Sequence, residues 1–136
     1  MEYLIGLILS LSVAGLARVV GFDRDRAFYP TVLIVVGSYY VLFAAMGASG
    51  RTLVIEIMGA MVFLLAAVVG FKKSLWIVVA GAVGHGVFDF VHHYFIENPG
   101  VPRWWPGFCA SYDVIMGVVL AVLLLRRANL AGGISN

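Results

Sequence analysis

Residues 84–93 read Gly-His-Gly-Val-Phe-Asp-Phe-Val-His-His and hold all three histidines of the chain together with one aspartate. The stretch lies in an apolar segment that is long enough to cross a membrane as a helix. At about 100° per helical residue, His85, Asp89, His92 and His93 fall within one arc of about 100°. An ionisable side chain near the middle of a bilayer costs roughly 2.5–3.5 kcal/mol, so these four indicate mutual partners, a cavity or a metal ion.

The composition around this stretch is that of an integral membrane protein. The chain has 136 residues, of which 62% are hydrophobic and only 12% charged, and its mean hydropathy is +1.03. A water-soluble domain of this length could not enclose so much apolar surface.

Five segments are apolar and about 20 residues long, which is the length a helix needs to cross a hydrocarbon core of about 30 Å. We expect helices because an open strand would leave backbone groups without partners in lipid. Residues 97–106 hold three prolines and are expected to form a loop. The expected fold is an all-α bundle of five transmembrane helices in a single domain over residues 1–136. The expected spans are 3–20, 30–48, 52–71, 75–95 and 108–125.

The basic residues of the loops indicate the orientation of the bundle. Five spans place the two termini on opposite sides, and seven basic residues fall on the side of the C-terminus: Arg18, Arg24, Arg26, Lys72, Lys73, Arg126 and Arg127. Only Arg51 and Arg103 fall on the other side. By the positive-inside rule the C-terminus is cytoplasmic and the N-terminus outside, in the inner (plasma) membrane of a cell.

The predicted partners follow from this placement. A net charge of +2 that comes from cytoplasmic loops favours contact with anionic headgroups of membrane lipids and not with nucleic acid. Assembly as a homo-oligomer or within a larger membrane complex is compatible with the sequence.

Three acidic residues on different predicted helices share one depth. At a rise of 1.5 Å per residue, Glu56 lies about 6 Å, Asp89 about 9 Å and Asp113 about 7 Å from the outer ends of their helices. Asp89 stands one turn from both His85 and His92, a spacing like that of the Glu-x-x-His units in di-metal bundles. The sequence therefore predicts one polar site in the outer leaflet.

Histidine and carboxylate ligands favour a divalent metal ion, with zinc first and iron or manganese as alternatives. The predicted ligands are His85, Asp89, His92, His93 and Asp113. If the protein is an enzyme, the set suits metal-dependent hydrolysis of a lipid or another amphiphile. Glu56 and Asp89 are then the catalytic candidates, Glu56 as a base on water at the metal and Asp89 as a bridging or orienting group.

Other interpretations remain open. The polar residues could form a packing network between helices or a proton or metal-ion conduit, and the protein could be a non-catalytic accessory or assembly subunit. His93 alone is more typical of an interfacial histidine, and Cys109 of a small buried hydrophobe. Tyr39 and Tyr40 are expected to pack, with entry of one hydroxyl into the site as the alternative. The loop over 97–106 is either a connector or a lid.

The polar residues from position 85 to 113 form the pattern His85-x3-Asp89-x2-His92-His93, then Asn98-Pro99, Pro102, and Cys109-x3-Asp113. This pattern resembles a family of small bacterial multi-pass membrane proteins of unknown function. The resemblance covers about residues 80–125 and implies that one unit is formed by His85, Asp89, His92, His93, Cys109 and Asp113, without naming a reaction. In site design only, the chain is also similar to the alkaline-ceramidase and adiponectin-receptor type of membrane hydrolase, which binds zinc near one membrane face.

Overall fold

The computed structural model describes residues 1–133, and within them all regular secondary structure is helical, without strands. All five long helices are long and apolar enough to cross a membrane, which confirms the predicted class. They are α1 (Glu2–Val20), α2 (Phe28–Gly47), α3 (Gly50–Lys72), α4 (Leu75–Phe95) and α5 (Trp105–Gly133). A short 3₁₀ turn, η1 (Phe22–Arg24), follows α1.

Four of the five helices begin one to three residues earlier than predicted, and two of these, α2 and α5, have a proline in the first turn. α2 starts at Phe28 with Pro30 as its third residue, and α5 starts at Trp105 with Pro106 as its second. A proline is tolerated there because the first N–H groups of a helix have no partner within the helix. α5 also continues to Gly133, eight residues beyond its predicted end, and so extends past the apolar segment.

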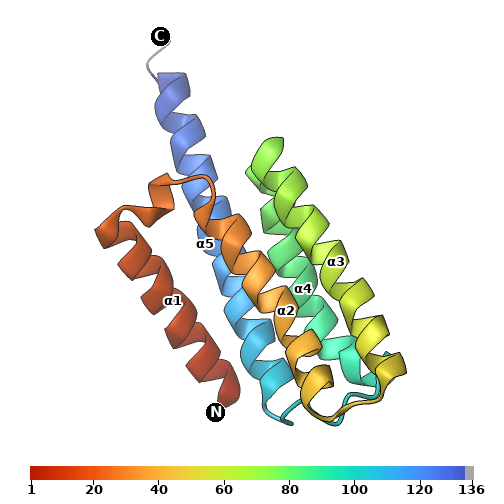
Figure 1. Cartoon of the computed structure of the whole chain (residues 1–136). Helices are drawn as coiled ribbons and strands as arrows, with labels where there is room; N and C mark the ends of the chain where they lie inside the picture. The colour runs from red at the N-terminus through yellow and green to blue at the C-terminus, as the bar shows by residue number, and fades with distance from the viewer. Residues whose placement is uncertain (134–136) are drawn as a thin grey trace.

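Helix α5 lies at the centre of the arrangement, between α4 on one side and α1 on the other (Figure 1). The other close helix pairs are α2 with α3 and α3 with α4. The contact of α1 with α5 depends on a small residue, since a Cβ added to Gly6 would overlap the carbonyl oxygen of Phe108 and the hydroxyl of Ser111. Ser10 strengthens it by donating a hydrogen bond to the carbonyl of Tyr112 at 3.0 Å.

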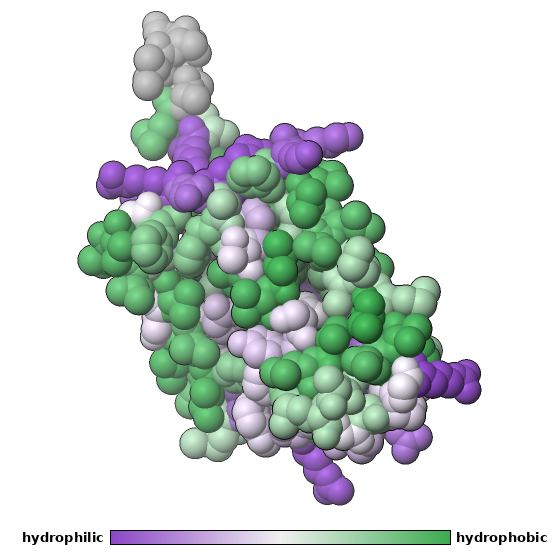
Figure 2. Space-filling model, viewed as in Figure 1, coloured by the Kyte–Doolittle hydropathy of each residue, from purple (hydrophilic) through white to green (hydrophobic). Residues whose placement is uncertain are grey.

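The two ends of the bundle differ in charge. We call the end that carries residues 21–27 and 73–74 the arginine end, and the end that carries residues 48–49 and 96–104 the loop end. At the arginine end, Arg18 donates to the buried Asp23 at 2.8 Å, and Arg127 donates to the Asp23 carbonyl. Figure 2 shows the matching distribution on one face, with hydrophobic residues over the middle and hydrophilic ones gathered towards the two ends.

The buried core changes character along its length. Towards the arginine end it is apolar, built from residues such as Leu33, Val78 and Leu120. Towards the loop end the buried side chains of α3, α4 and α5 are instead charged or polar. The fold therefore encloses a polar site in one half of the bundle.

Candidate metal centre

Helix α4 supplies most of the site, because its buried residues recur every three or four positions and form one stripe. That stripe begins with apolar residues at Leu75 and Val78 and ends with His85, Asp89 and His92. The three polar members are each at most 2% exposed. The helical wheel predicted this shared face, and the structure turns it towards the neighbouring helices.

Helix α5 brings Asp113 to the same point. His85 Nδ1 lies 2.6 Å from Asp113 Oδ2 and 3.5 Å from Asp89 Oδ2. One ligand atom from each of these three residues lies within 4.8 Å of the other two, which is a separation that a single metal ion can bridge. We call His85, Asp89 and Asp113 the triad.

Two atoms of the triad lack a hydrogen-bond partner among the described residues. They are His85 Nε2 and Asp89 Oδ2, and both are buried. Leaving a buried polar atom unpaired costs about 1–3 kcal/mol, and more where the group is charged. His85 Nδ1 faces both aspartates, so a cation between the three side chains would offset that cost at Asp89 Oδ2.

A glycine lets the two helices approach closely enough to form the triad. A Cβ added to Gly86 would lie 3.0 Å from the Ala110 carbonyl oxygen, 2.9 Å from Val114 and 3.5 Å from Asp113 Cβ. A larger residue there would push α5 away from α4. Gly84, two positions earlier on the same helix, faces open space.

Glu56 and His92 form a second buried group beside the triad. His92 Nε2 lies 2.8 Å from Glu56 Oε1, and Asn98 donates to the same oxygen at 2.8 Å. Asn98 also donates to the backbone carbonyl of Tyr40 at 3.1 Å. The depth argument placed Glu56 at the level of the site, and the structure agrees, but its contacts are with His92 and Asn98 and not with the triad.

Tyr40 joins the two groups. Its hydroxyl donates to Asp89 Oδ1 at 2.7 Å, while its ring stacks on His92 with centroids 3.9 Å apart. Phe88 closes the side of this stack with edge contacts to both rings. Tyr40 thus follows the predicted alternative in which one tyrosine hydroxyl enters the site, and which hydroxyl does so depends on how α2 sits against α4.

Two predicted ligands lie outside the triad: His92 pairs with Glu56 beside it, and His93 lies outside the site altogether. Its side chain is exposed and packs on Tyr94, with ring centroids 3.8 Å apart. Cys109, one turn before Asp113 on α5, is buried and unpaired, as expected of a small hydrophobe.

Sequence reasoning missed Asn98 as a functional residue, although its neighbour Pro99 pointed to a fixed turn. Within the loop over 96–104, Asn98 is 9% exposed and carries the contacts that fix the loop end of α2 and α3. A lone asparagine in a proline-rich loop is typical of a turn, so its role depends on the fold. The loop contributes directly to the site, beyond the connector or lid that we expected.

No family model matches this chain, and comparison with curated proteins and with solved structures also finds no match. The resemblance to a small bacterial membrane family therefore stays a prediction. Fold and site together define the class: a protein of five candidate membrane helices with a buried group of one histidine and two aspartates that could hold a metal ion.

Proposed function

We propose that this protein is a membrane metalloprotein that binds one divalent cation between His85, Asp89 and Asp113. The observation that carries the proposal is the buried triad, with its ligand atoms within 4.8 Å of one another and with two of its polar atoms unpaired. Two buried carboxylates beside one imidazole have a strong need for positive charge, because burying an unpaired charge is expensive.

The chemistry of the ligands limits the ion. One imidazole and two carboxylates suit zinc, manganese or ferrous iron. Three protein ligands leave a coordination position for water, as catalytic zinc sites do, whereas structural zinc sites are closed by four protein ligands. The proposed site is therefore of the catalytic type.

We propose hydrolysis of an ester or amide bond in an amphiphile as the reaction. A cation with an open position polarises a bound water or a substrate carbonyl, and a site within the bilayer meets amphiphilic substrates first. Asp89 acts in this scheme as a ligand that Tyr40 orients. Glu56, which we expected to be the base, takes a positioning role with His92 and Asn98, because none of its contacts reaches the triad.

The proposed setting is the outer leaflet of a bacterial inner membrane. The arginine end carries the residues counted as cytoplasmic, and the triad lies in the half of the bundle nearer the loop end. The positive-inside rule supports this orientation.

The experiment is hydrolysis of a phosphatidylcholine with a fluorogenic acyl chain, in mixed micelles, by protein stripped with a chelator and reloaded with zinc, manganese or ferrous iron. We expect activity only after reloading. Asp113→Asn should abolish it, since the amide keeps the shape but removes a charge, while the exposed His93→Ala should retain it. Activity that survives stripping, or that Asp113→Asn leaves intact, would rule out catalysis at the triad.

A second candidate function, proton relay, is favoured by one observation. Hydrogen bonds or close contacts connect Asp113, His85, Asp89 and Tyr40, and such chains of carboxylate and histidine mark proton paths in membranes. A relay needs no metal. The test is proton flux into vesicles that contain chelator-treated protein. If the flux occurs and Asp113→Asn abolishes it, proton relay would replace hydrolysis as the proposed function.

A further inference from the structure

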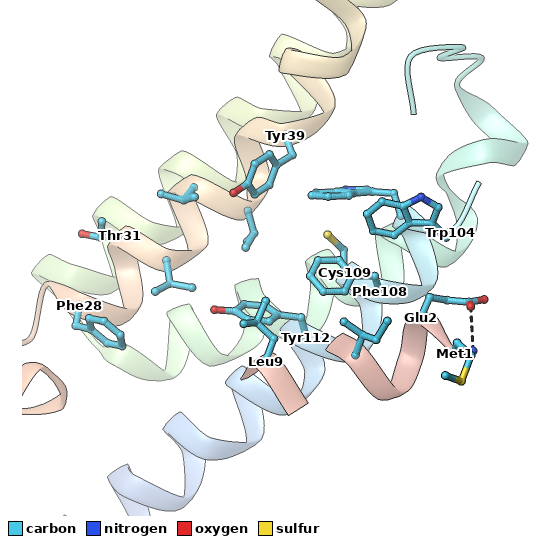
Figure 3. Close-up of a pocket in the computed structure, with 15 residues that line it drawn as sticks. Met1, Glu2, Leu9, Phe28, Thr31, Tyr39, Trp104, Phe108, Cys109 and Tyr112 are labelled. Carbon is cyan, nitrogen blue, oxygen red and sulfur yellow. Dashed lines mark hydrogen bonds and ion pairs between the residues drawn. The ribbon is translucent and has the colours of Figure 1, made fainter. Parts of the chain in front are cut away.

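A groove of about 740 Å³ runs between α1 and α2, with α5 as its floor. Figure 3 shows Tyr39 and Phe28 of α2 on one side, Leu9 of α1 on another, and Cys109 of α5 between them. Aliphatic and aromatic side chains make up most of the lining. No triad residue lines the groove, so it is a separate feature from the candidate metal centre.

The groove opens towards the lipid of the bilayer, so an apolar occupant is expected. Both of its walls belong to helices that are long and apolar enough to cross a membrane. Lining residues such as Ile5, Leu9 and Val35 are 54%, 43% and 46% exposed, and in a bilayer that exposure is to lipid. A volume of this size is typical of pockets that hold small ligands, which range over about 300–1,000 Å³.

The shape of the groove favours a hydrocarbon chain over a protein helix. Its lining extends from Phe28 to Tyr39 on α2, which is about 17 Å at the helical rise. That is about half of a hydrocarbon core of about 30 Å, the depth of one leaflet. A helix is about 10 Å across, so an equal length of it would need on the order of 1,300 Å³. A single acyl chain is far narrower.

The aromatic end of the groove supplies a polar anchor. Trp105 lines the groove, and its indole Nε1 is buried without a hydrogen-bond partner among the described residues. Tyr39 and Phe43 contact the ring edge-on, at centroid distances of 5.0 and 4.9 Å. A buried indole N–H normally finds an acceptor, and a shift of the ring towards the groove would let the ester carbonyl of a lipid at the headgroup level provide one.

We propose that the groove between α1 and α2 binds one acyl chain of a membrane phospholipid, with the lipid ester at Trp105 and the chain end towards Phe28. Binding of this lipid does not require the metal ion. The groove could deliver substrate to a catalytic triad, yet lipid binding stands if the triad proves to be inert.

The test uses full-length protein in phosphatidylcholine vesicles that contain a trace of phosphatidylcholine with a diazirine in one acyl chain. After irradiation, peptide mass spectrometry maps the adducts. We expect adducts to concentrate on Leu9 and Val35 above the exposed α3 residues Val54 and Val62, which are 57% and 61% exposed and so sample ordinary lipid.

Two variants sharpen the mapping. Val35→Trp fills the groove and should reduce adducts on Leu9 to the level of α3, whereas Ile34→Trp, the neighbouring α2 residue outside the groove, should leave them unchanged. Trp105→Phe keeps the ring but removes the donor, and should weaken labelling about two- to tenfold, the worth of one hydrogen bond.

Uniform labelling of the groove and α3 in the wild-type protein would overturn the proposal, as would labelling that Val35→Trp does not change. Adducts on α3 with none at the groove would also overturn it, and would show that another occupant, such as a second copy of the chain, keeps lipid out. Labelling of chelator-treated protein tests lipid binding in the groove independently of metal binding at the triad.

Discussion

Tyr40 is the residue on which the two halves of the site depend. Its hydroxyl is the hydrogen-bond donor to Asp89 Oδ1, and its ring holds His92 in a stack. A donor that orients a ligating carboxylate fixes the geometry of the metal site without touching the ion. Tyr40 therefore transmits the position of α2 and of the loop, through Asn98, to the triad.

Replacing Tyr40 by phenylalanine should lower the affinity for the metal ion about 10–100-fold, as is typical when the partner of a ligand is removed. The ring and its stack on His92 remain, so the fold should persist. Tyr39→Phe is the matched control, because no hydrogen bond from the Tyr39 hydroxyl holds the site. Competition with a chelator of known affinity measures both variants, and an equal effect of the two would contradict a special role for Tyr40.

The sequence predicted which residues belong to the site better than it predicted which side chains they contact. The helical wheel identified His85, Asp89 and His92 as one face, and helix depth connected Glu56 and Asp113 to it. The wheel also included His93, since an arc of about 100° does not show where burial stops. Asn98 and the Tyr40 hydroxyl depend on helix rotation and loop path, which periodicity does not encode.

The contact between α4 and α5 sets the distance from His85 to Asp113. Both helices are apolar over most of their length, so hydrophobicity alone does not draw one to the other in lipid. Small residues provide the contact instead, because they let backbones approach and increase van der Waals packing. Gly86 lies beside the triad and Gly117 further along the same seam, where an added Cβ would lie 2.9 Å from Val83.

We expect Gly86→Ala to separate the helices and to cost about 1–3 kcal/mol of stability, as overpacking of a tight interface does. Metal affinity should fall with it. Gly84→Ala, on the exposed side of the same helix, should be neutral or stabilising, since alanine favours a helix by about 1 kcal/mol over glycine. Thermal unfolding in detergent distinguishes the two, and a Gly84→Ala variant as unstable as Gly86→Ala would show that the seam is not the cause.

The five helices were predictable because 20-residue apolar segments in lipid have no alternative to helix. Their ends were harder to predict where proline occurs. Pro30 and Pro106 were read as helix boundaries, although a proline in the first turn lacks only a bond that the turn would not form. The extension of α5 past Arg126 and Arg127 was missed because hydropathy ends with the bilayer while the helix does not.

The whole molecule combines two features that hydropathy could not place together. Polar groups from four helices and one loop meet in the half of the bundle near the loop end, and an apolar groove lies on the other side of α5, between α1 and α2. Which helices are neighbours depends on packing and not on the number of spans. The groove forms because α1 packs closely along α5 and does not pack closely against α2.

The two proposed sites adjoin near the loop end. The triad would hold a cation beneath that end, and the groove would hold a lipid chain that begins at Trp105 there and extends towards Phe28, beside the arginine end. An arrangement of this kind brings an amphiphile near a metal ion without exposing the ion to bulk water, which strengthens the electrostatic effect of the ion.

Metal content of the purified protein tests the central claim most directly. Elemental analysis of wild-type protein, Asp113→Asn and His93→Ala should follow equal exposure to a chelator and reloading with zinc, manganese or ferrous iron. The triad predicts a stoichiometric ion in the wild type and in His93→Ala, and little or none in Asp113→Asn, where one ligand charge is gone. A wild-type protein that retains no ion would contradict the claim, and so would an ion that is lost from His93→Ala but kept by Asp113→Asn.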